Sequence, residues 1–215
     1  PQEQKAPRAA LKDGLQNLAR HVENLAKFRL RTVIAINRFP GDTDDEIHYV
    51  KSFCAGLGVE CSAVDVFEKG GSGGLELAAK IIEAASKAKL EEIKPLYPAR
   101  LSIQEKISVI AGEIYGAGSV YFEPAAEKKL EKLSALGFSS LPVCMAKTQF
   151  SLSDDPKKLG APRNWTLTVT DAHLASGAGF VVVVSGSAVL MPGLSKNPQA
   201  LRISVDSEGK ITGLI

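Results

Sequence analysis

Two short segments of this chain place an aromatic ring beside polar, basic and glycine residues. They are Asn37-Arg38-Phe39-Pro40 and Phe67-Glu68-Lys69-Gly70-Gly71. An aromatic ring can stack on a flat ligand, Arg and Lys side chains can contact phosphates, and glycine lets the backbone approach a ligand closely. These residue types favour a site for a flat small molecule, and the Asn37 amide could face a nucleotide base.

The elements around these segments are predicted to bring them together. An apolar, β-branched run over residues 32–36 predicts a buried strand, and residues 59–66 predict a second. A capping box, Thr43 to Glu46, opens a helix between the two strands. Strands separated by helices are usually parallel, and ligands of open parallel sheets bind beyond the carboxyl ends of the strands. We therefore expect Phe39 and Phe67 at the same sheet edge.

The spacing of the rings leaves alternatives open. Neighbouring strands would lie about 5 Å apart and strands separated by one other about 10 Å apart, and the wider spacing would admit a flat ring between the two aromatic faces. In the other interpretation, both rings cap the hydrophobic core. The GGSGG run at residues 70–74 either forms an anion site at a helix N-terminus or is a flexible surface turn. It lacks the GxxxxGK[ST] pattern of a Walker A loop.

The whole chain predicts an α/β fold with a parallel βαβ-type N-terminal half and an α+β, β-rich C-terminal half. We place a domain boundary between residues 95 and 96, inside a proline-containing junction. Five helices are expected. The first covers residues 9–28, the second follows Thr43, and the third follows GGSGG with Leu75 to Ala85 on its apolar face. The fourth follows the Ser102 capping box, and the fifth runs from Pro124 to Gly137. The expected strands of the second half are residues 141–146, 165–170, 180–184, 188–191, 201–206 and 210–215, and the last two form a hairpin.

Composition and charge exclude several classes of protein. The 215 residues carry 26 basic and 24 acidic side chains, well interspersed, which argues against a nucleic-acid partner. The longest apolar run, AGFVVVV, is too short to span a bilayer, so we expect no membrane contact. Cys54, Cys61 and Cys144 are interpreted as reduced packing residues of a cytoplasmic protein.

The remaining polar candidates are weaker. Lys147 with Asp154 and Asp155 could be catalytic, but Ser, Asp and Pro around them favour a solvated loop. The three histidines are scattered over different elements, which argues against a metal site or a catalytic dyad. Trp165 begins a strand and is interpreted as a packing residue.

Six stretches, spread over residues 17–194 of the chain, resemble formate–tetrahydrofolate ligase, also called 10-formyltetrahydrofolate synthetase. They are NLARHVENLAKF, VIAINRFPGDTDDEI, FEKGGSGGLELA, LSIQEKISVIAGEIYGAGSV, LPVCMAKTQFSLSDDPKKLGAP and GAGFVVVVSGSAVLMPGL. The chain resembles the C-terminal part of that family's enzymes.

The resemblance implies a reaction, its substrates and a role for the two rings. In the family, ATP with Mg²⁺ phosphorylates formate, and N10 of tetrahydrofolate attacks the formyl phosphate to give 10-formyltetrahydrofolate. Two aromatic side chains that sandwich the folate ring match Phe39, beside Pro40, and Phe67. Arg38, Lys69, Gly70 and Gly71 would then be phosphate or folate-tail contacts, although surface charges are the alternative for the first two. The family forms homo-oligomers, which we expect here.

Two departures from the family pattern matter. The family usually has Trp where this chain has Phe67, so the stacking area is smaller and the indole N–H is missing. The phosphate-binding loop and the basic residue that steadies formyl phosphate are absent. The chain also begins without Met. We therefore expect a fragment with no catalytic residue of its own, inactive alone and completed by the N-terminal part of the enzyme. The alternative is a non-catalytic folate-binding or oligomerisation module.

Overall fold

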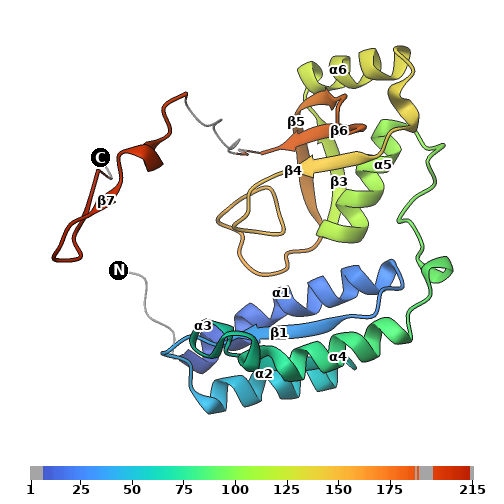
Figure 1. Ribbon diagram of the computed structural model, residues 1–215. Helices are drawn as coiled ribbons and strands as arrows, with labels where there is room; N and C mark the ends of the chain where they lie inside the picture. Colours follow the sequence, from blue (N-terminus) through green and yellow to red (C-terminus); the bar gives the residue numbers. More distant parts are fainter. Residues whose placement is uncertain (1–6, 187, 189–195, 214–215) are drawn as a thin grey trace.

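A computed structural model describes residues 7–186, 188 and 196–213 of the chain (Figure 1). No helix within these ranges is both long and apolar enough to cross a bilayer. The elements form a pair of parallel strands with helices, a four-stranded sheet with helices, and a short hairpin.

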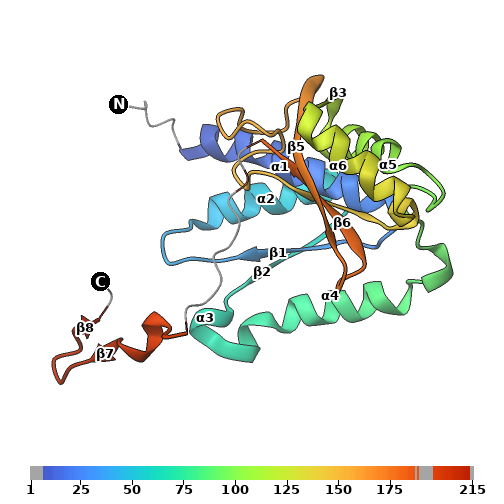
Figure 2. The ribbon, with the colours of Figure 1, turned by 90° about the horizontal axis from the view of Figure 1, so that it is seen from above.

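The first part of the chain is a parallel strand pair between helices, as the sequence predicts. Its main elements, in order, are α1 (Pro7–Lys27), β1 (Val33–Asn37), α2 (Asp44–Gly56), β2 (Glu60–Val64), α3 (Val66–Lys69), the 3₁₀ helix η1 (Gly70–Gly74) and α4 (Leu75–Ser86). The strands are direct neighbours, in register from Val33 with Glu60 to Asn37 with Val64. In both views, α1 and α4 lie on opposite sides of the strands (Figures 1 and 2).

The capping box at the start of α2 is present in the structure. The Thr43 hydroxyl accepts from the Glu46 amide, while the Glu46 carboxylate accepts from the Thr43 amide and hydroxyl. Bonds from the Thr43 amide and hydroxyl lower the pKa of Glu46. This reciprocal bonding fixes the residue at which the helix begins, and so fixes the length of the preceding loop.

One apolar face of α4 is exposed. Leu75, Ala78, Ala79 and Ile82 lie on the predicted apolar face of this helix, and all four are exposed, with Leu75 at 68% and Ile82 at 69%. Leu77 and Ala84, on the opposite side of the helix, are half-buried. A helix that is apolar on both faces is normally covered on both, so this stripe is a candidate surface for further protein.

The second part of the chain is a mixed sheet with two covering helices. A 3₁₀ turn, η2 (Leu90–Glu92), lies in the connection to it, and its elements are α5 (Ile103–Ile110), the π-helical turn η3 (Ala111–Tyr115), β3 (Ala117–Phe122), α6 (Pro124–Ala135), η4 (Phe138–Ser140), β4 (Val143–Ala146), β5 (Trp165–Ala175) and β6 (Phe180–Ser185). The order β3-β5-β6-β4 combines two parallel pairs with one antiparallel pair. Strand β3 was missed by the sequence prediction.

The core beside this sheet buries apolar side chains of the predicted helices and strands. Ile103 and Ile107 of α5 and Leu130 of α6 are fully buried against Leu167 and Val181 of the sheet. Trp165 belongs to the same cluster, which confirms its packing role. Cys54 and Cys61 are also buried, whereas Cys144 is exposed, so the packing interpretation of the third cysteine was wrong.

The end of the chain forms the predicted hairpin, but with shorter strands. After η5 (Gln199–Leu201), β7 (Ser204–Val205) pairs antiparallel with β8 (Ile211–Thr212). Most of the strand expected at 188–191 and the last two residues of the strand expected at 210–215 lie outside the described residues. The domain boundary at 95 and 96 stays a prediction.

Polar side chains of α1 connect the two sheets. Arg20 is buried, and its guanidinium donates to the carbonyl oxygens of Glu113 at 3.0 Å and Ile114 at 3.2 Å. One turn further along α1, the Asn24 amide donates to the same Ile114 oxygen at 2.9 Å. These carbonyls lie at the C-terminal end of the α5–η3 helix, where backbone oxygens lack partners within the helix.

We expect Arg20→Ala to lower the free energy of unfolding by about 2–3 kcal/mol, because the buried Arg20 side chain and its hydrogen bonds to the carbonyl oxygens of Glu113 and Ile114 are lost. Urea denaturation followed by circular dichroism measures the change. Arg163→Ala is the control: this arginine is exposed, and its ion pair with Glu23 at 3.4 Å should be worth less than about 1 kcal/mol. Equal losses in the two variants would contradict the account.

Candidate functional site

The first site loop begins at the carboxyl end of β1. The Arg38 amide donates to the Val64 carbonyl at 3.0 Å, which extends the ladder between the strands by one bond. The chain then turns tightly, because the Asp42 carboxylate accepts from the Phe39 amide at 2.9 Å and the Asp42 amide donates to the Phe39 carbonyl at 3.0 Å. This turn holds the backbone of Phe39 in place while its ring stays 62% exposed.

The second site loop begins at the carboxyl end of β2. Asp65 precedes the single turn of α3, and the Lys69 amide donates to the Asp65 carbonyl at 3.0 Å. Within this turn, the Phe67 ring is 91% exposed. The interpretation that both rings cap the core is therefore wrong, since each ring projects mainly into solvent.

The glycine run is ordered against Asp65. The Asp65 amide donates to the Gly73 carbonyl at 3.1 Å. A Cβ atom on Gly73 would lie 2.2 Å from the Asp65 carbonyl oxygen, so any other residue would push the two segments apart. Gly70 has φ of +56°, which other residues rarely adopt. The run is a 3₁₀ turn with a packing role and not an unstructured surface turn.

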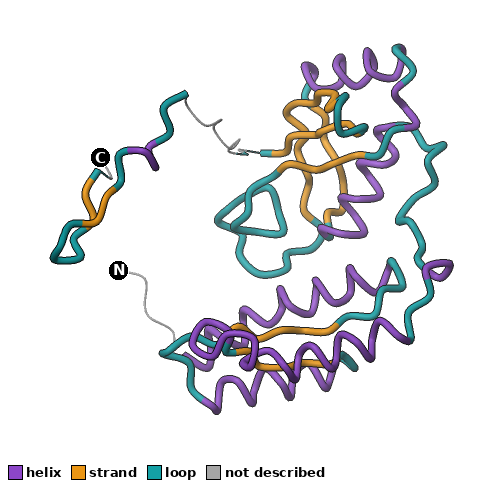
Figure 3. Tube along the Cα trace, viewed as in Figure 1, coloured by secondary structure: helices purple, strands orange, loops and turns teal. Residues whose placement is uncertain are grey.

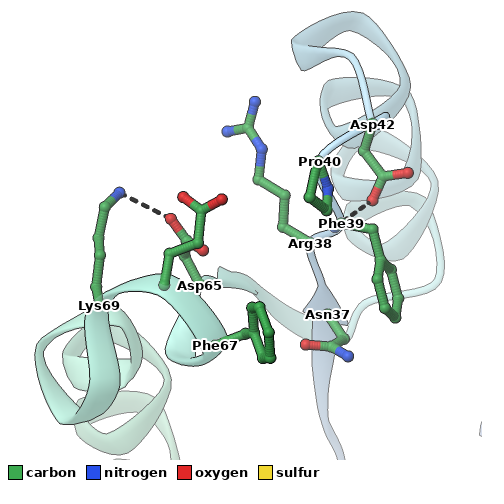
Figure 4. A pocket seen from close by; sticks show the side chains of 9 residues that line it. Asn37, Arg38, Phe39, Pro40, Asp42, Asp65, Phe67 and Lys69 are labelled. Carbon is green, nitrogen blue, oxygen red and sulfur yellow. Dashed lines mark hydrogen bonds and ion pairs between the residues drawn. The ribbon is translucent and has the colours of Figure 1, made fainter. Parts of the chain in front are cut away.

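The two loops enclose a pocket of about 540 Å³, which we call the edge pocket. Its lining consists of Asn37, Arg38, Phe39, Pro40, Asp42, Asp65, Phe67, Glu68 and Lys69 (Figure 4). Figure 4 shows the Phe39 and Phe67 side chains leaving different loops, with the Asn37 amide at the end of β1. Gly70 and Gly71 are not among the described residues that line the pocket.

The edge pocket brings together six of the eight predicted site residues without an intervening strand. Since β1 and β2 pair directly, the alternative with one strand between them does not apply. The pocket opens beyond the strand ends, where the two loops diverge. Sequence reasoning missed Asp42, Asp65 and Glu68, although Asp65 directly follows β2 and could have been found by its position.

Both basic side chains of the pocket already have acidic partners. Arg38 contacts the Asp44 carboxylate at 2.7 Å, and Lys69 contacts the Asp65 carboxylate at 2.9 Å. Both ion pairs are partly exposed, and such pairs typically contribute about 0–1 kcal/mol. Replacing the carboxylate partner of either basic side chain by a ligand would therefore cost about 0–1 kcal/mol.

The Lys147–Asp155 segment belongs to the long loop between β4 and β5, drawn in teal in Figure 3. It has a structural role instead of the expected solvated character, because several of its side chains are buried. Lys147 Nζ donates to the carbonyl oxygens of Thr148, Ser151 and Ser153, and Ser153 is fully buried. Burial lowers the pKa of Lys147, while the Asp154 charge opposes that shift. The Asp154 carboxylate accepts from the Thr168 amide at 2.8 Å, so it anchors the loop to the sheet.

The fold and the edge pocket define a class: an α/β protein with an aromatic-lined pocket at the carboxyl edge of parallel strands. Comparison with known families is more specific. The sequence profile described as formate–tetrahydrofolate ligase matches residues 2–215. The chain belongs to the formate–tetrahydrofolate ligase family. Membership supports a ligase-type function on formate and tetrahydrofolate, and implies folate and ATP as substrates.

Proposed function

We propose that this chain provides the folate-stacking wall of a formate–tetrahydrofolate ligase, with the pteridine ring held between Phe39 and Phe67 in the edge pocket. The observation that carries the proposal is the exposure of both rings at one pocket, 62% and 91%. Large exposed apolar side chains that gather at one place usually mark a binding surface. The pocket volume of about 540 Å³ suits a ligand of this size.

Stacking on the two rings would supply a modest part of the free energy of binding. An offset-stacked ring pair is worth roughly 0.5–1.5 kcal/mol beyond burial, so two faces contribute about twice that. Phe67 offers less area than the Trp usual at this position, and it lacks the indole N–H. Arg38 and Lys69 would bind phosphate or the folate tail by exchanging their carboxylate partners, and Gly70 and Gly71 would contribute backbone contacts.

We propose that the phosphoryl-transfer step depends on residues that this sequence does not contain. The reaction needs positioning and charge stabilisation around ATP, Mg²⁺ and formate. The chain has no GxxxxGK[ST] loop. Its proposed partner is therefore the N-terminal part of the enzyme, which carries the phosphate machinery.

A non-catalytic module for folate binding or oligomerisation is the second candidate. The exposed apolar stripe of α4 favours it, because such a face is normally covered by other protein. The same stripe supports the proposed homo-oligomer. We propose a cytoplasmic location, which fits the three cysteines of the described ranges, since none of them is in a disulfide.

We expect Phe39→Ala to weaken tetrahydrofolate binding to this chain about tenfold, because one stacking face is lost. Isothermal titration calorimetry measures the affinity. Phe150→Ala is the matched control, since Phe150 is also exposed but does not line the edge pocket, and it should leave the affinity unchanged. Equal affinities for wild type and Phe39→Ala would contradict the stacking role.

We expect this chain alone to show no formate-dependent release of ADP from ATP, because its phosphate site is incomplete. A coupled assay for ADP, run with formate, tetrahydrofolate and Mg²⁺ and again without formate, measures the rate. A complete enzyme of the family is the positive control. Formate-dependent turnover by the chain alone would overturn the proposed division of the active site.

A further inference from the structure

The edge pocket has an acidic side that stacking does not use. Asp42, Asp65 and Glu68 all line it. The Asp42 carboxylate accepts from the Phe39 amide and thereby holds the turn of the first loop. Glu68 is exposed on α3. Asp65 differs from both, because it follows β2 directly and its side chain is only 22% exposed.

Backbone hydrogen bonds and close packing fix the position of Asp65. Its amide donates to Gly73, its carbonyl accepts from the Lys69 amide, and the close approach of Gly73 leaves little room for it to move. The second loop is thus built around Asp65, and Phe67 lies two residues further along. A ligand stacked on the Phe67 ring would therefore meet a carboxylate in a set position.

The Asp65 carboxylate retains acceptor capacity. Although Asp65 occupies the N-cap position of α3, its side chain makes no capping hydrogen bond. One of its oxygens, Oδ2, contacts Lys69 Nζ at 2.9 Å. An ionised carboxylate offers about four lone-pair positions, so a single lysine contact leaves most of them for a ligand.

The pteridine ring carries two adjacent donors, the 2-amino group and N3–H, on one edge. A carboxylate can accept both in a two-point, charge-assisted arrangement. We propose that Asp65 accepts these two hydrogen bonds and so determines how the ring lies between Phe39 and Phe67. This inference rests on the proposed folate site, and it makes Asp65 the residue that selects a 2-amino pteridine over a flat ring without that group.

The test compares two ligands on three proteins by calorimetry with the full chain. The ligands are tetrahydrofolate and its 2-desamino analogue, in which hydrogen replaces the 2-amino group. The proteins are wild type, Asp65→Asn and Glu68→Gln, and the last is the matched control because it also removes one carboxylate charge from the pocket.

We expect Asp65→Asn to weaken tetrahydrofolate binding by about tenfold to a hundredfold, the range for loss of hydrogen bonds to a charged group. Its effect on the 2-desamino analogue should be several times smaller, because one of the two hydrogen bonds is already missing. Glu68→Gln should change both affinities by less than about threefold, as for an exposed charge.

The outcomes separate this inference from the proposed function. If wild type binds tetrahydrofolate and Asp65→Asn binds it equally well, the proposed role of Asp65 is overturned. The proposed stacking by Phe39 and Phe67 is then unaffected. Equal losses for both ligands in Asp65→Asn would show a structural role only, which also overturns the inference. No binding by wild type would overturn the proposed folate site and this inference with it.

Discussion

The direct parallel pairing of β1 with β2 is the constraint on which the site depends. The register ends with Asn37 opposite Val64, and the Arg38 amide adds a last bond to Val64. Both loops must therefore leave the sheet at one edge and at one level. As a result, Phe39 and Phe67, which are 28 residues apart in the sequence, line the same pocket. Their placement requires no contact between the two loops. A one-residue shift of either strand would turn its side chains to the opposite face.

The position of α1 links this strand pair to the rest of the molecule. Arg20 and Asn24 satisfy carbonyl oxygens at the end of the α5–η3 helix, and Lys27 pairs with Glu113 at 2.7 Å. The same helix carries the α5 side chains that fill the core of the four-stranded sheet. The polar face of α1 thus acts as the cap of a helix that lies about 90 residues away in sequence. No helix-capping signal within α5 itself predicts this.

The sequence predicts local features well because local chemistry determines them. The capping box of Thr43, the alternation of strands and helices, and the place of Phe39 and Phe67 at one edge follow from residue type and spacing, whereas the second strand ends at Val64 and not at Val66, which belongs to α3. The exposure of a side chain depends on which distant parts of the chain pack against it. The α4 stripe with Leu75 and Ile82 has the pattern of a core face, and only the structure shows that it faces solvent. The Lys147 loop fails for a related reason. Polar residues predict solvation, but here a lysine and backbone carbonyls satisfy one another inside the fold.

The central claim is that Phe39 and Phe67 lie on the two faces of one pteridine ring. Nuclear Overhauser effects between the C7 protons of tetrahydrofolate and the ring protons of the chain test it most directly, with assignments from Phe39→Leu and Phe67→Leu. The account predicts contacts from both rings and an upfield ring-current shift of the ligand protons. Contacts to only one of the two rings, or to a phenylalanine outside the edge pocket such as Phe150, would contradict it.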